Sequence, residues 1–151
     1  MAELDTQRQI AVLKDQLERL RKADAGAVSS TWTPTMVGNS TAGVTTYALQ
    51  QGAWVRVGSL VVVTGTVVWT AATGTGNANF GLPFTAANTT NQFFSGGVRV
   101  EGVTFTNSAP QVVISPNTAF FNLISPITNA VGATVTVEAA GNVIFTVSYF
   151  I

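Results

Sequence analysis

Cysteine and histidine are both missing from this chain of 151 residues. Without cysteine the chain forms no disulfide and offers no thiolate to a metal, so its redox compartment cannot be read from the sequence. Without histidine, serine-type, cysteine-type and general acid–base enzyme sites lose their usual base. We therefore expect a protein that is not an enzyme, with no catalytic residue, no cofactor and no bound metal.

Charge is nearly absent from most of the chain. Ten of the fourteen charged residues lie within the first 24 positions, and the rest of the sequence contains only Arg56, Arg99, Glu101 and Glu138. Such a segment creates little electrostatic field to attract phosphate groups or an anionic lipid surface. Nucleic-acid binding and docking on a membrane surface are therefore disfavoured. Two carboxylates are also too few for an ordinary oxygen-ligand metal site.

Long apolar runs are missing as well. The longest aliphatic run, residues 60–63, is far shorter than the ~20 residues that a membrane-spanning helix requires. The N-terminal residues 1–5 are acidic and lack the apolar centre of a secretory signal. We expect a protein that is made in the cytoplasm without a signal peptide and does not insert into a membrane.

The N-terminal segment, residues 1–25, is predicted to be helical from residue 3 to residue 24. Its apolar residues follow the 3-4-3 spacing of a coiled-coil seam and are Ile10, Leu13, Leu17 and Leu20. The alternative is an amphipathic helix that packs on its own β domain, but the apolar stripe is narrow for that role. Ile10 and Leu13 favour a two-stranded coil whereas Leu17 does not, so the number of strands stays open. The seam predicts an oligomer of this chain.

After a predicted linker at residues 26–42, the hydrophobic period changes to two. Between residues 143 and 151, for example, apolar side chains alternate with side chains such as Thr146 and Ser148, which is typical of half-buried antiparallel strands. Turn signals rich in glycine, asparagine and proline divide residues 43–151 into about eight or nine short strands. We predict an all-β, jelly-roll-like sandwich. Residues 60–69 are apolar on both faces, which suits a central strand or one covered by a neighbouring subunit.

Glu101 and Glu138 could form a glycosidase pair if their carboxylates lay ~5–9.5 Å apart. The favoured interpretation is that each lies on the solvent face of its strand and pairs with Arg99 or Arg56. The glycine-rich stretch 74–76 is not followed by a lysine, so phosphate binding there is not expected.

Residues 85–97 are the best candidate for recognition. They form a polar, uncharged stretch that ends in paired aromatic residues, and amides beside an aromatic ring suit a neutral sugar. The possible receptor contacts are Asn88, Asn91, Gln92, Phe93 and Phe94. The competing interpretation is that the polar residues only make turns and both phenylalanines are buried.

Three stretches of the sequence together resemble a known module. They are Thr31-Trp32-Thr33-Pro34, the pattern Tyr47-x-x-Gln50-x-Gly52-x-Trp54-Val55-Arg56-x-Gly58, and Gly74-Thr75-Gly76 followed by Gly81-Leu82-Pro83-Phe84. Their order and spacing resemble the small β module found near the C-termini of many tailed-phage tail-fibre and virion-surface proteins. The resemblance covers roughly residues 30–86. It implies a jelly-roll-like domain, usually trimeric, displayed on a virion, and it carries no site residues with it.

The functional hypothesis is a bacteriophage virion structural protein. It would be a homotrimeric short fibre or knob for host attachment, joined to other virion proteins through its helix, with a host cell-surface glycan as a further candidate partner. Because the sequence starts at its own short helix without a long shaft, a head fibre or a capsid decoration (cement) protein is a serious alternative. A carbohydrate-binding module and a depolymerase are more remote ones.

Overall fold

The computed structural model describes residues 2–24, 26–105, 108–127 and 129–151, so positions 1 and 25 of the predicted helical segment lie outside the described residues. Helix α1 (Ala2–Asp24) is followed by ten described strands, which form most of the domain after it. Their bounds are β1 (Ala27–Trp32), β2 (Met36–Gly38), β3 (Thr45–Val57), β4 (Leu60–Ala72), β5 (Ala78–Gly81), β6 (Phe94–Glu101), β7 (Gln111–Ile114), β8 (Phe120–Ile127), β9 (Ala130–Thr134) and β10 (Gly141–Phe150). Within these described segments, no helix has the length and apolarity that a membrane crossing requires.

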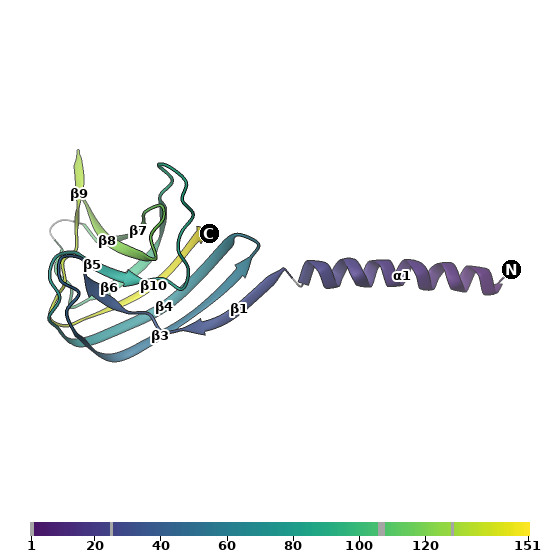
Figure 1. The fold of residues 1–151 in the computed structure, drawn as a ribbon, viewed down its shortest axis with the longest axis horizontal. Coiled ribbons are helices and arrows are strands. Elements are labelled where there is room, and N and C mark those ends of the chain that lie inside the picture. Colours follow the sequence, from purple (N-terminus) through teal and green to yellow (C-terminus); the bar gives the residue numbers. More distant parts are fainter. Residues whose placement is uncertain (1, 25, 106–107, 128) are drawn as a thin grey trace.

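The strands belong to one antiparallel sheet that curls on itself, as Figure 1 shows. Their order is β1-β3-β4-β10-β6-β7-β8-β5-β2, and β9 pairs with β8. The predicted antiparallel β domain behind an N-terminal helix is confirmed. The segment 26–42, which we expected to be a linker, contributes β1 and β2 to this sheet, so it belongs to the β domain. These two strands also bring the number above the expected eight or nine.

One face of the curled sheet is buried and the other is exposed. Side chains on β4 and β10 alternate between the two faces: Val61 and Val63 are fully buried, whereas Val62 between them is exposed. Aromatic rings fill the centre of the curl, where Phe121 lies 5.0 Å from Phe80 and 4.7 Å from Phe145 between ring centroids. The core is therefore enclosed by the curvature of a single sheet.

A row of two glycines allows this curvature. Gly52 on β3 and Gly65 on β4 are cross-strand partners, and an aromatic ring covers each of them from the core side. A β-carbon at Gly52 would meet the Trp32 ring at 2.4 Å, and one at Gly65 would meet the Phe145 ring at 2.6 Å. The two rings meet edge to face at 6.3 Å. Glycine is thus required at both positions, because larger residues would displace the rings.

Gly65→Ala tests this packing. We expect the variant to lose roughly 1–3 kcal/mol of folding free energy, because its β-carbon overlaps the Phe145 ring. Gly97→Ala is the matched control, since a β-carbon at Gly97 on β6 meets nothing within 4 Å. Urea unfolding followed by tryptophan fluorescence measures both variants. Equal midpoints for the two variants would show that the glycine row does not limit the packing.

Tyr149 ties the end of β10 to the loop that follows β5. Its side chain is buried, and its hydroxyl donates a hydrogen bond to the carbonyl oxygen of Phe84 at 3.1 Å. Burial raises the pKa of Tyr149 from 10.0 to about 12. The folded state therefore favours the neutral phenol more strongly than the unfolded chain does.

This shift predicts an alkaline loss of stability. Because the folded pKa is raised, the contribution of Tyr149 is complete below pH 10 and falls as the pH rises toward 12. At pH 12 the loss of folding free energy amounts to about 2 kcal/mol. Tyr149→Phe removes this pH dependence. The difference in stability between wild type and variant therefore reports the titration of Tyr149 separately from that of other groups. Denaturant midpoints measured between pH 9 and pH 12 that fall in parallel for both proteins would refute the assignment.

Candidate functional site

The predicted seam of α1 is uncovered in the described chain. Ile10, Leu13, Leu17 and Leu20 are between 47% and 67% exposed, and the helix extends away from the β domain (Figure 1). The Nε atom of Arg19 lies 3.0 Å from the Asp15 carboxylate, one turn earlier on the helix. This exposed ion pair supports the helix only weakly. The alternative of a helix folded back on its own domain is not the arrangement observed here.

A second exposed apolar surface lies on the outer face of the sheet. We call it the outer patch; its members are Val55 and Val57 on β3, Leu60 and Val62 on β4, and Phe150 on β10. The strand register places Val57 beside Leu60 and Leu60 beside Phe150. Each member is between 37% and 54% exposed. The outer patch surrounds the β3–β4 turn, at the end of the sheet where β1 begins.

A groove opens at the same end, on the core-facing side of the sheet. This helix-end groove has a volume of about 350 Å³ and is lined by Gly26, Val28, Trp54, Arg56, Gly58 and Phe84. The rings of Trp54 and Phe84 meet edge to face at 4.8 Å. Arg56 donates from Nε to the Gly58 carbonyl oxygen at 2.7 Å, which fixes its side chain along the rim. The groove can therefore accept an apolar side chain from outside the domain.

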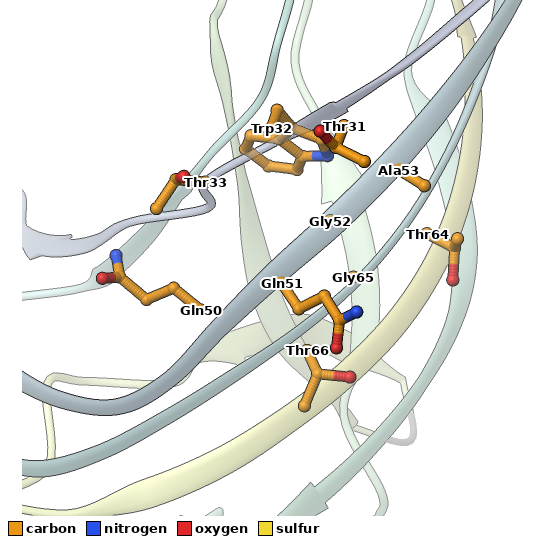
Figure 2. Close-up of a pocket in the computed structure, with 10 residues that line it drawn as sticks. All are labelled: Thr31, Trp32, Thr33, Gln50, Gln51, Gly52, Ala53, Thr64, Gly65 and Thr66. Carbon is orange, nitrogen blue, oxygen red and sulfur yellow. The ribbon is translucent and has the colours of Figure 1, made fainter.

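A further pocket lies where β1 ends beside β3 and β4, and Figure 2 shows its lining. Its volume is about 520 Å³, and it is lined by Thr31, Trp32, Thr33, Gln50, Gln51, Gly52, Ala53, Thr64, Gly65 and Thr66. The Trp32 Nε1 atom is buried and has no hydrogen-bond partner among the described residues. The Trp32 ring packs over Gly52, so it is not free to stack on a ligand. The threonine hydroxyls and glutamine amides of this lining can hydrogen-bond a neutral polar molecule.

This pocket was not predicted from the sequence. Threonine and glutamine residues surround Trp32 and Gly52 in the stretches that carry the phage-module resemblance, and that clustering was the available signal. Predicting the pocket also required the register of β3 against β4, which sets Gln51 beside Thr66. Figure 2 shows these two side chains next to each other.

The predicted receptor loop lies at the helix end of the sheet. The Ala87 N–H donates to the Phe150 carbonyl oxygen at 2.7 Å, which places the loop at the end of the sheet that holds the β3–β4 turn and the start of β1. Asn88, Asn91 and Phe93 are exposed, and Asn91 adopts a left-handed turn conformation with φ of 61°. Gln92 and Phe94 are partly buried, and Phe94 contacts Tyr149 and Phe150.

The two carboxylates of the β domain have separate surroundings. Glu101 pairs with Arg99 and accepts a hydrogen bond from Asn142 at 3.0 Å. Glu138 lines a small pocket of about 170 Å³ with threonines 134 and 136, and Glu101 is not part of that lining. Across the described residues, no group of three metal-ligating side chains comes together.

Most of the surfaces described above are apolar, and one pocket is polar without charge. The seam, the outer patch and the helix-end groove are exposed and apolar, and the pocket in Figure 2 is uncharged. Comparisons of the chain with protein-family models, with curated proteins and with solved structures give no match.

Proposed function

We propose that the protein is a non-enzymatic structural protein of a bacteriophage virion. In this proposal it is a homotrimeric short fibre or knob, with α1 as a coiled-coil stalk that also joins other virion proteins. The jelly-roll-like β domain is displayed for host attachment. The observation that carries the proposal is the exposed seam of Ile10, Leu13, Leu17 and Leu20 on a helix that extends away from its domain.

The seam supplies part of the free energy that an oligomer needs. Covering the exposed half of each Ile or Leu side chain stabilises a bundle by roughly 1 kcal/mol. Three chains with four such residues each give on the order of 10 kcal/mol, whereas a trimer requires two association steps that each cost about 4–15 kcal/mol. The bundle is therefore favourable only with help from further contacts. The virion assignment is supported by the resemblance over roughly residues 30–86.

Two other functions compete with attachment. A capsid decoration protein would use the same oligomer to clamp capsid subunits, and its copy number per particle would be in the hundreds instead of a few dozen or fewer. A carbohydrate-binding role is favoured by one observation, the uncharged pocket of hydroxyl and amide groups in Figure 2. Such groups match the hydroxyls of a neutral sugar.

Leu17→Asp tests the stalk. We expect wild-type protein to have three times the single-chain mass by light scattering, and the variant to shift toward single chains, because it places a charge in the seam. Val12→Asp is the matched control: Val12 is 57% exposed on α1 but lies outside the seam, so its mass should not change. Circular dichroism of both variants should retain the β signal. A wild-type protein with single-chain mass at micromolar concentration would refute the proposal.

Glycan binding separates the two candidate contact regions. We expect the purified protein to bind neutral glycans on an array without shortening them, and Gln51→Ala combined with Thr66→Ala to lose that binding. Alanine at Asn91, Gln92 and Phe93 should leave binding intact, because that loop lies at the helix end. Loss of binding in the loop variant alone, with unchanged melting temperature, would place recognition at residues 85–97 instead. If no glycan on the array binds, the carbohydrate-binding function is excluded. If the protein shortens glycan chains and Glu101→Gln or Glu138→Gln abolishes this activity, the non-enzymatic proposal is contradicted.

A further inference from the structure

The outer patch and the helix-end groove lie on opposite faces of the sheet and share strand β3. Along β3, Val55 and Val57 point to the outer face, whereas Trp54 and Arg56 between them point to the groove. On β1, Val28 pairs with Arg56 and therefore shares the groove face. Both surfaces lie at the end of the sheet where β1 begins, a short step from the end of α1.

The connection between α1 and β1 restricts where a second β domain can lie. Helix α1 ends at Asp24 and β1 begins at Ala27. If α1 forms the proposed bundle, helix axes ~8–10 Å apart and this short link keep the β1 start points of two copies within about 30 Å. A domain of this size is roughly 35 Å across. The helix ends of neighbouring β domains are therefore held within reach of one another, and this step rests on the proposed function.

The composition of these surfaces suits a second copy of the chain. Depletion of charge and enrichment of aromatic and aliphatic side chains are typical of permanent homo-oligomer interfaces. Arg56 is part of the groove lining, whereas Glu101 at the end of β6 and Glu138 beside Trp69 lie at the opposite end of the sheet. Strand β1, at the sheet edge between the two surfaces, contains neither charge nor proline, the usual protections of an exposed edge.

We propose that the outer patch of one copy packs into the helix-end groove of the next copy around the stalk. The contact is heterologous, because each copy uses one surface on one side and a different surface on the other. A heterologous contact closes into a ring only with three or more copies, since a two-fold dimer uses the same surface twice. The contact thus selects a trimer over a dimer, a choice that the seam residues leave open.

Cysteine cross-linking tests this contact, because the natural chain has no cysteine. Val28→Cys marks the groove and Val62→Cys marks the outer patch; both positions are exposed, so the substitutions should be tolerated. The double variant, treated with a short bismaleimide, should give covalent dimers and closed trimers, whereas each single variant should stay a single chain on a denaturing gel. Within one chain the two residues lie on opposite faces of the sheet with β3 between their strands, so they cannot react with each other.

Ile144→Cys with Val28→Cys is the matched control. Ile144 shares the outer face but pairs with Thr66, nearer the opposite end of the sheet, so no cross-link is expected. Val28→Cys with Leu60→Cys provides a second test pair. Covalent dimers from Val62→Cys alone would indicate a two-fold contact and overturn the inference. If light scattering shows an oligomer but neither test pair gives cross-links, the inferred contact is wrong and the coiled-coil stalk still stands. If light scattering shows a single-chain mass, the stalk is refuted as well.

Discussion

The antiparallel pairing of β3, β4 and β10 determines which side chains form the core and which form the outer surface of the sheet. These three long strands carry the core on one face, through residues such as Val63 and Phe145, and the outer patch on the other. Because side chains alternate strictly along a strand, a register shift of one residue would exchange the two faces. The glycine row at Gly52 and Gly65 keeps that register compatible with curvature, since the aromatic rings that enclose the core occupy the space above both glycines.

Several elements followed from local patterns in the sequence. The apolar spacing and charge of residues 3–24 predicted a helix, and α1 covers Ala2–Asp24. The alternation between residues 143 and 151 predicted the last strand with its buried and exposed rows. Residues 60–69, which are apolar on both faces, belong to β4, a central strand between β3 and β10 whose outer side is exposed.

Other elements depended on partners far away in the sequence. The segment 26–42 was taken for a linker because its residues are small and polar, yet β1 pairs with β3 and β2 pairs with β5. The position of β2 is held by the Tyr47 hydroxyl, which accepts from the Met36 N–H at 2.7 Å. The location of the loop at 85–97 likewise required the strand order, since its contacts with Tyr149 and Phe150 at the end of β10 place it at that end of the sheet. The pocket of Figure 2 combines three strands and was invisible to a local pattern for the same reason.

Assembly around α1 is the central claim, and the symmetry of the purified particle tests it most directly. Class averages of the full-length protein by electron microscopy should display three β domains arranged as a closed ring at one end of a single thin rod. In that arrangement the helix ends of the domains meet at the rod, and the loops of the opposite end face outward. A single β domain with a free helix, or two domains related by a two-fold axis, would contradict the account.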